Sequence, residues 1–594
     1  MRLSVGDQAL LSDCQSAALV SSGGCVSWWP APRFDSASAF TALLDDDAGH
    51  WTICPAEPFE SERRYRDDTL VLETLMQTET GAVKVIDALV FAHGARGHEI
   101  GRDVPHALAR VVEGIEGDVE LAVEFVPRPE YGLAVPQLVE DDEGLATRGG
   151  PERLFLRGDR PLEAAESSAR GAFMLRAGET VGWIVHRVAG ALAEAPPLLD
   201  PHAAIADTTA AWRSWCELHE HFEGEHADAV RFAGIVTQGL TYQPSGAVVA
   251  APTTSLPEIR GGHSNWDYRY GWLRDAAMIA RALSIATCSD EAVRYFDWIV
   301  HAGTGCSDDD HVQVVFGVDG ERDLSEHELT HLDGHGGARP VRVGNAAWEQ
   351  TQLDVLGHVL DCAWVLRDDL DLGEPVTRRF LRQLADRAAE EWREPDSGIW
   401  EGREDERHYT VSKLGCWTAL DRAVRLADRL GGDAAAWAEA RDEVRETILR
   451  ESWCEERNAF AGSLGSDHLD AGVLLMPLVE FLPADDPRMA STIAAIEDEL
   501  GHDGLLRRWT GAEDGAFLLA SFWLAECHAR AGALDRADAV FARAAGAAND
   551  VGLLAEEVEL ASGEALGNTP QAISHVGLVT AAVAITEARS RRPA

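Results

Sequence analysis

The segment "AFLLASFWLAECHA" at residues 516–529 is apolar on nearly every side, and "AISHVGLVTAAVAI" at 572–585 has the same character. The segment "AAAWAEARDEVRETILR" at 434–450 is instead amphipathic, with one charged face. A helix that is apolar all round belongs inside a protein, whereas an amphipathic helix covers its outside. This contrast predicts two concentric layers of helices in the second part of the chain.

The helical pattern begins near residue 225 and contains twelve candidate helices. Several of the even-numbered ones are apolar all round, and odd-numbered ones such as the seventh are amphipathic. Six inner helices that alternate with six outer ones predict an (α/α)6 toroid; a superhelical array of α-hairpins would not bury alternate helices so completely. The candidates start near residues 226, 272, 289, 345, 375, 410, 434, 468, 486, 514, 534 and 569.

The first 200 residues have a different pattern, in which short β-branched or alternating runs are bounded by Gly, Pro and Asp. Such regular spacing predicts an antiparallel β-sandwich. The expected organisation is a sandwich domain at 1–200, a connecting helix and linker at 201–224, and a catalytic (α/α)6 barrel at 225–594. The runs are "TLVLETLMQT", "AVKVIDALVF", "ALARVVEGI", "VELAVEFVP", "RLFLRG", "GAFMLRA" and "TVGWIVHRV".

The charge balance is strongly acidic: the 594 residues contain 100 Asp and Glu against 52 Lys and Arg, a formal net charge of −48. Such a surface repels nucleic acids and anionic membranes, so neither is expected as a partner. The acidic residues are spread along the whole chain, which favours the surface of a salt-loving organism's protein, screened by high ionic strength. A merely acidic enzyme from a mesophile is the alternative.

The ten cysteines include no C-x-x-C pair, so reduced thiols are expected rather than disulfides or a zinc knuckle. The first twenty residues show no twin arginine and no long apolar stretch, and no run of about 18 apolar residues occurs. We therefore expect a cytoplasmic protein without a membrane span. A homo-oligomer is one possibility, and the sequence does not decide the oligomeric state.

The chemically unusual residues cluster in the loops that precede the inner helices, which must all emerge at one end of a toroid. Tryptophan, arginine and carboxylates together are typical of a sugar site, because aromatic faces stack on pyranose rings, charged groups fix hydroxyls and two carboxylates move protons. The loops are "GGHSNWDYRYGWLRDA" (261–276), "RPVRVGNAAWEQ" (339–350), "GIWEGREDERHYTVSK" (398–413), "RRWTGAEDG" (507–515) and "LLAEEVELASGEALGNTPQ" (553–571).

These motifs resemble the bacterial and archaeal branch of glycoside hydrolase family 15, the glucoamylase and trehalase family. The resemblance also rests on "TTSLPE" (253–258), "GVDGERDLSEHEL" (317–329), "SFWLAE" (521–526) and "SWWPAPRFDS" (27–36), and it covers essentially the whole chain. It implies an inverting, exo-acting α-glucosidase that releases β-glucose and needs no organic cofactor or metal.

The resemblance also assigns residues. The family's general acid falls on Glu401 and its general base on Glu556, with the carboxyl groups about 6.5–9.5 Å apart so that a water fits between them. The pair that grips the non-reducing sugar falls on Arg274 and Asp275, and a further sugar-binding arginine falls on Arg508.

Other candidate substrate-binding residues are less specific. Trp400 and Trp509 could serve as sugar platforms, whereas Trp266, also a candidate, resembles Trp272 and Trp417 in being more typical of a core. The loops add Arg342, Asn345 and Lys413, and Lys413 is one of only two lysines. It could serve the acid's loop or form a structural ion pair.

Several alternatives remain at this point. Glu557 could replace Glu556 as the base. Residues 327–331 read His-Glu-Leu-Thr-His, a zinc-protease signature that requires a helix, but the glycines and proline that follow break a helix. A carbohydrate-binding protein without catalysis is a third class, although intact Glu401 and Glu556 argue against it.

Two substrates compete: trehalose or another small disaccharide, and α-1,4-linked malto-oligosaccharide. The fungal glucan-cleaving branch has a second Glu after Trp-Glu, whereas this chain has Gly402 at that position. This difference favours the small substrate. The sandwich is expected to brace the toroid, and Trp28, Arg33 or Asp35 could lend a loop to the site.

Overall fold

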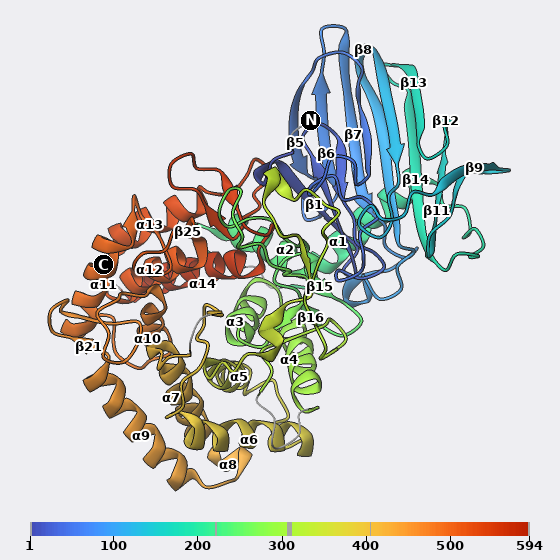
Figure 1. Ribbon diagram of the computed structural model, residues 1–594. Helices are drawn as coiled ribbons and strands as arrows, with labels where there is room; N and C mark the ends of the chain where they lie inside the picture. Colours follow the sequence, from blue (N-terminus) through green and yellow to red (C-terminus); the bar gives the residue numbers. More distant parts are fainter. Residues whose placement is uncertain (1–2, 220–221, 306–311, 404–405, 592–594) are drawn as a thin grey trace.

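The computed structural model describes residues 3–219, 222–305, 312–403 and 406–591. Figure 1 shows a strand-rich part, coloured blue to teal, beside a helical part coloured green to red. The predicted architecture, an antiparallel sandwich followed by a helical toroid, is confirmed. The division at residues 200 and 225 stays a prediction; the last sandwich strand ends at Ala189, and the next helix, α1, spans Pro201–Cys216.

The sandwich consists of two antiparallel sheets that share one long strand, β8 (Ala107–Val126). Buried Arg110, on the first half of β8, donates to the backbone carbonyl of Trp51 in the other sheet and to that of Gly24 in the turn that precedes Cys25. One sheet also contains β1 (Gln8–Ser12), β2 (Ala17–Ser21), β3 (Cys25–Trp28), β4 (His50–Pro55), β12 (Glu163–Ala164) and β13 (Ala169–Arg176), and the other β5 (Glu60–Tyr65), β6 (Leu72–Gln77), β7 (Gly81–Leu89), β9 (Gln137–Asp141), β10 (Gly144–Arg148), β11 (Glu152–Gly158) and β14 (Thr180–Ala189).

The long strand departs from the sequence analysis, which expected separate strands at 107–115 and 119–127. The intervening Gly114 and Gly117 do not end the strand. Gly117 has φ +64°, which favours glycine, and a Cβ there would approach the carbonyl oxygen of Thr80 to 2.1 Å. These glycines let β8 continue from one sheet into the other without a turn.

The helical part follows the predicted alternation. In the inner α12 every residue from Leu518 to Ala529 is buried, whereas in the outer α9 only four residues are buried. The inner layer comprises α3 (Ala276–Ala286), α5 (Asp354–Val365), α7 (Thr410–Arg425), η5 with α10 (Ala471–Leu474 and Leu475–Leu478), α12 (Leu518–Arg530) and α14 (Ala572–Arg591), and the outer layer α2 (Ala227–Gly239), α4 (Ser289–Gly303), α6 (Pro375–Glu391), α9 (Ala434–Glu451), α11 (Pro487–Glu499) and α13 (Leu534–Ala545).

The inner helices close into a ring, because each packs against the next one and α14 packs against both α12 and α3. Several begin later than predicted; the fourth starts at Asp354 rather than near 345, after the short 3-10 helix η4 (Ala346–Glu349). The preceding loops instead contain two-residue strands, such as β17 (Gly271–Trp272) and β26 (Glu557–Val558). These short strands hold the loops at the mouth of the ring.

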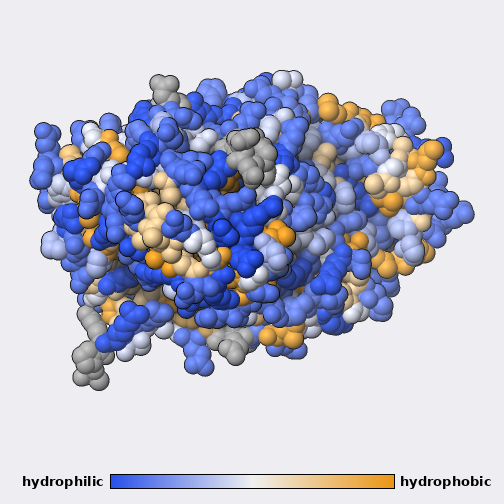
Figure 2. All heavy atoms as spheres, turned by 90° about the horizontal axis from the view of Figure 1, so that it is seen from below, coloured by the Kyte–Doolittle hydropathy of each residue, from blue (hydrophilic) through white to orange (hydrophobic). Residues whose placement is uncertain are grey.

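The surface is mostly hydrophilic over the face shown in Figure 2, with small scattered hydrophobic areas. Among the described residues, no helix combines the length and the apolar character needed to cross a membrane. The nine cysteines in this part of the chain are free thiols.

Candidate active site

A cavity of about 430 Å³ lies at the mouth of the helical ring. Nine of the eleven predicted site residues line it: Glu401, Glu556, Arg274, Asp275, Trp400, Arg508, Asn345, Trp266 and Trp509. The structure therefore brings together five loops that are far apart in the sequence.

Glu401 lies in a tight turn that precedes α7. Its backbone adopts φ +57°, a left-handed conformation that is costly for a residue other than glycine. Its Oε1 accepts hydrogen bonds from the indole of Trp272 and the guanidinium of Arg274, each at 2.7 Å. Arg274 also donates to the carbonyl of Ile399 at 2.9 Å, which ties the Glu401 carboxyl group to its own loop.

Glu556 enters the cavity from the residue before β26, and its carbonyl accepts from the amide of Leu518, the first residue of α12. The side chain is almost fully buried. Its Oε1 accepts from the hydroxyl of Tyr268 at 2.7 Å, whereas its Oε2 has no hydrogen-bond partner within the protein. Burial, and then the negative charge of Glu258, raise the pKa of Glu556 to about 8.

Glu557 does not line the cavity. Its Oε1 lies 3.1 Å from the guanidinium of Arg508, and its Oε2 accepts from the amide of Gly515 at 2.9 Å. Arg508 also binds Glu258, at 2.5 Å, and Asp514. Three carboxylates thus surround one arginine, which fixes the guanidinium at the cavity wall.

Several buried oxygens of the cavity lining have no hydrogen-bond donor within the protein. Buried polar atoms are normally satisfied, so unsatisfied acceptors that share one cavity indicate a ligand rich in hydroxyl donors. These atoms are Oδ1 of Asp275, Oε1 of Glu258, Oδ1 of Asp514, Oε2 of Glu556 and Oε1 of Gln571.

The predicted pair Arg274 and Asp275 lies at the start of α3, with Arg274 Nε 3.6 Å from Asp275 Oδ1. Burial raises the pKa of Asp275 to about 6. Arg274 contacts Glu401 directly, so the same side chain faces both the carboxyl group and the cavity.

The aromatic lining is held by polar contacts. The indole of Trp400 donates to both carboxylate oxygens of Asp470, at 2.9 and 3.0 Å, and its ring centroid lies 6.1 Å from that of Trp509. The guanidinium groups of Arg403 and Arg342 lie 3.9 and 4.5 Å from the centroid of the Trp266 ring. These rings form apolar walls of the kind on which a pyranose stacks.

Two predicted residues lie outside the lining. Arg342 stacks on Trp266, bonds the carbonyls of His263 and Asn265 and pairs with Glu326, so it supports the wall. Lys413, on α7, is buried and donates to the carbonyl of Glu394. Lys413 therefore supports the backbone before the Glu401 turn through a backbone carbonyl, a contact that is neither the expected role in the acid's loop nor the expected ion pair.

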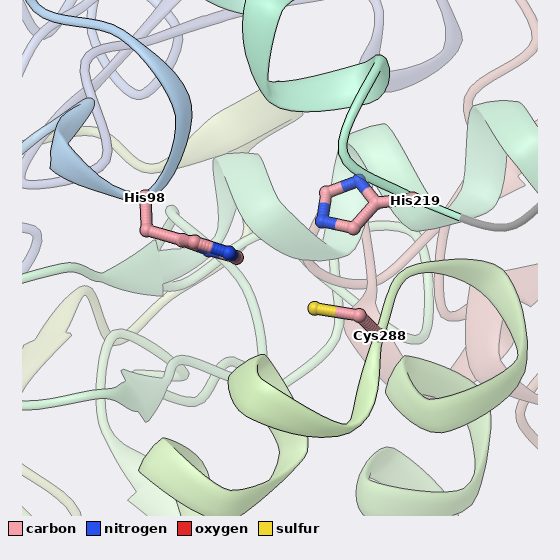
Figure 3. A group of neighbouring side chains, drawn as sticks. All are labelled: His98, His219 and Cys288. Carbon is pink, nitrogen blue, oxygen red and sulfur yellow. The ribbon is translucent and has the colours of Figure 1, made fainter.

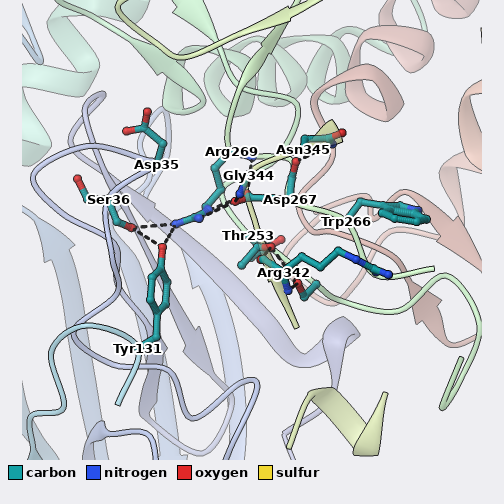
Figure 4. A network of polar contacts seen from close by, with 12 residues as sticks. Asp35, Ser36, Tyr131, Thr253, Trp266, Asp267, Arg269, Arg342, Gly344 and Asn345 are labelled. Carbon is teal, nitrogen blue, oxygen red and sulfur yellow. Dashed lines mark hydrogen bonds and ion pairs between the residues drawn. The ribbon is translucent and has the colours of Figure 1, made fainter. Parts of the chain in front are cut away.

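The sandwich braces this site without lining it. Fully buried Arg269 donates to the carbonyl of Ser36 and the hydroxyl of Tyr131, at 2.8 and 2.7 Å, and forms a bidentate pair with Asp267 (Figure 4). Asp267 in turn accepts from the amide of Gly344 and the side-chain amide of Asn345.

The sandwich residues Trp28, Arg33 and Asp35 serve the same contact rather than the cavity. Trp28 donates to the carbonyl of Pro252, and Arg33 pairs with Asp35 and with Asp319. The hypothesis that they enter the site is wrong, because the cavity lining contains none of them.

The zinc-protease alternative fails on geometry. His327 and Glu328 form strand β19, which pairs with β20 (Arg342–Val343), and His331 contacts the carbonyl of Tyr131. Histidines four residues apart share a face only on a helix, so this stretch does not form the metal site of that class.

Sequence reasoning missed Tyr268 and Glu258, and it placed Trp272 in the core. Tyr268 and Trp272 bond the two glutamates, and their rings lie 5.6 Å apart. All three residues stand inside motifs that were recognised, "TTSLPE" and "NWDYRYGW". A sequence pattern does not tell which of their side chains point toward the cavity.

Comparison with protein families gives two matches. The family described as glycosyl hydrolases family 15 matches residues 226–583, and the one described as "Trehalase-like, N-terminal" matches residues 3–160.

Individual relatives cover nearly the whole chain. A trehalase of Mycobacterium tuberculosis is 36% identical over 98% of this chain and 90% of its own length, and a trehalase of Thermoplasma volcanium is 29% identical over 97% and 93%. A bacterial glucoamylase solved with acarbose has the same fold, with a TM-score of 0.75, 14% identity and coverage of 98% of this chain and 94% of its own.

Proposed function

The chain belongs to glycosyl hydrolase family 15, and on that premise we propose that it hydrolyses trehalose with inversion, using Glu401 as general acid and Glu556 as general base. The observation that carries the proposal is the shared cavity, in which two glutamates from loops over 150 residues apart lie among unsatisfied hydroxyl acceptors.

Glu401 is proposed as the proton donor because it follows Trp400 in the motif that resembles the family's acid. Arg274 and Trp272 hold one of its oxygens, Oε1, so the proton belongs on Oε2, the oxygen left to face the glycosidic bond. When the bond breaks, the new carboxylate charge is stabilised by the same two donors.

Glu556 is proposed as the base because its Oε2 is the atom that lacks a protein donor. A water bound there would lose a proton to Oε2 as its oxygen attacks the anomeric carbon from the face opposite Glu401. Tyr268 holds the other oxygen and orients the carboxylate. The spacing of about 6.5–9.5 Å between the two carboxyl groups stays part of this proposal.

Trehalose is preferred over malto-oligosaccharide for two reasons. Relatives that cover nearly the whole chain are trehalases, and Gly402 stands in the cavity lining where the glucan-cleaving branch has its second glutamate. A cavity of about 430 Å³ also suits a disaccharide. Arg508, Asp275 and the tryptophans Trp400, Trp509 and Trp266 are proposed to bind its two rings.

The test is a panel of trehalose, maltose, maltotriose and isomaltose with early product anomers followed by NMR. Inversion of trehalose replaces one α-linkage by a β-hydroxyl and releases the other sugar as α-glucose, so equal amounts of the two anomers are expected at first. Maltose cleaved faster than trehalose would overturn the substrate, and α-glucose alone from trehalose would overturn inversion.

We further propose that the enzyme works in the cytoplasm. The nine free thiols in the described part of the chain suit a reducing compartment. Fractionation of native cells should recover the hydrolase with cytoplasmic markers, and its recovery outside the cells would refute this placement.

A further inference from the structure

Three side chains with metal-binding atoms converge away from the active site, at the junction between the sandwich and the helical part. They are His98, on the 3-10 helix η2 (Gly97–Glu99), His219, three residues beyond the end of α1, and Cys288, the N-cap residue of α4. One ligand atom of each lies within 4.8 Å of those of the other two. Figure 3 shows both imidazoles and the thiol turned toward one shared space. None of the three lines the active-site cavity.

From this convergence we propose that His98, His219 and Cys288 bind a divalent transition-metal ion, Zn²⁺ by ligand chemistry, that fastens the sandwich to the helical part. Two imidazole nitrogens and one sulfur are the donor set that zinc prefers. Bond lengths of about 2.0–2.3 Å place tetrahedral ligands about 3.5 Å apart, so the side chains need to close by only about 1 Å.

The surroundings of His98 supply the support that a metal-binding histidine needs. Its Nδ1 lies 2.9 Å from Oε1 of Glu291, a buried carboxylate that also accepts from the indole of Trp215 at 3.1 Å. A carboxylate on one ring nitrogen keeps the proton there and leaves the Nε2 lone pair for the metal. Arg294, 3.3 Å from the second oxygen of Glu291, holds that carboxylate in place.

The fourth ligand position and the Cys288 thiol complete the proposed site. Asp290 Oδ2 lies 3.9 Å from His98 Nε2, so this exposed carboxylate or a water can take the fourth position. Binding replaces the S–H bond of Cys288 by a sulfur–metal bond and releases one proton to solvent. The thiol lies at the start of α4, where burial raises its pKa and the backbone amides of Glu291 and Asp290 act in the opposite direction, so the metal ion itself has to displace the proton.

Cobalt is a suitable probe, because a Co²⁺–thiolate bond gives a charge-transfer absorption in the near ultraviolet that Co²⁺ on oxygen or nitrogen alone does not. We expect the full-length, chelator-treated protein to bind one Co²⁺ with this absorption and Zn²⁺ to displace it. Cys288→Ser should abolish the absorption and Cys454→Ser, at another half-buried thiol, should keep it. Glu291→Gln should weaken the affinity by about 10- to 100-fold.

A second readout does not depend on how the variants fold. Zn²⁺ should protect Cys288 of the wild-type protein from alkylation and leave Cys454 reactive, as mapped by peptide mass spectrometry. The proposal is overturned if the wild-type protein shows neither the absorption nor the protection, or if a folded Cys288→Ser variant keeps the absorption. Neither readout measures hydrolysis, so both are independent of the proposed function.

Discussion

The pKa of Glu556, the proposed base, is set by opposing influences on its buried carboxyl group. Burial and the charge of Glu258 raise its pKa to about 8, while the charge of Arg508 and the hydrogen bond donated by the hydroxyl of Tyr268 act in the opposite direction. A base is useful only when ionised, so this hydrogen bond extends the pH range of activity downward.

Replacing Tyr268→Phe removes that donor, which raises the pKa of Glu556 further. The base is then protonated over a wider range, so the acidic limb of the kcat/KM profile should move to higher pH. Tyr270→Phe is the control, since Tyr270 is buried nearby but does not line the cavity. An unchanged limb in Tyr268→Phe, or an equal shift in both variants, would contradict this account of Glu556.

The kinetics of variants at Glu556 and Glu557 distinguish the two candidate bases. Glu557 is held by Arg508 and the amide of Gly515 behind the cavity wall, so Glu557→Gln should misplace Arg508 and chiefly raise KM. Glu556→Gln should instead lower kcat by at least about 100-fold, the usual contribution of a general base. Steady-state kinetics on trehalose decide between them; a larger kcat loss in Glu557→Gln would reverse the assignment.

At the scale of single residues, the sequence predicted which loops carry the site better than what each side chain does. The Trp-Glu and Arg-Asp patterns predicted Glu401, Arg274 and Asp275 as site residues, and the structure places all three in the lining of one cavity. Lys413 and Arg342 lie outside the cavity lining, because a charged residue in a site loop can support the loop from behind. Tyr268 was missed because only the fold turns its hydroxyl toward Glu556.

At the scale of elements, the pair Arg269–Asp267 joins the sandwich to the loop that leads into η4. Both side chains are fully buried, and removing one partner of such a pair leaves the other charge uncompensated. Arg269→Met should therefore cost about 3–5 kcal/mol of the free energy of unfolding in urea. The exposed pair Arg170–Glu124 is the control, and Arg170→Met should cost less than about 1 kcal/mol. Equal costs would show that the buried pair does not hold the domains together.

Helix type and order were predictable because burial on all sides leaves a clear mark on sequence. The residues at which helices start and strands end were less predictable from the sequence. Helix α3, for example, begins at Ala276 rather than near 272, because the preceding residues form strand β17. Strand β8 runs through Gly114 and Gly117, which look like a turn. In both cases tertiary hydrogen bonds override the local signal.

For the whole molecule, the net charge of −48 predicts a salt-dependent fold. Repulsion between surface carboxylates destabilises the compact state, and ions shorten its range from about 10 Å at 0.1 M to about 3 Å at 1 M. The melting temperature should therefore rise as KCl increases from low to molar concentration. A melting temperature that stays flat or falls over this range would refute the interpretation of the surface as salt-adapted.

The central claim is that Glu401 donates a proton to the leaving group and Glu556 activates water. It is tested most directly by comparing Glu401→Gln and Glu556→Gln on trehalose and on α-glucosyl fluoride, whose leaving fluoride needs no proton. Both variants should lose at least about 100-fold in kcat on trehalose. Glu401→Gln should retain most of its activity on the fluoride, whereas Glu556→Gln should lose it. The reverse pattern, with Glu556→Gln active on the fluoride and Glu401→Gln inactive, would contradict the account.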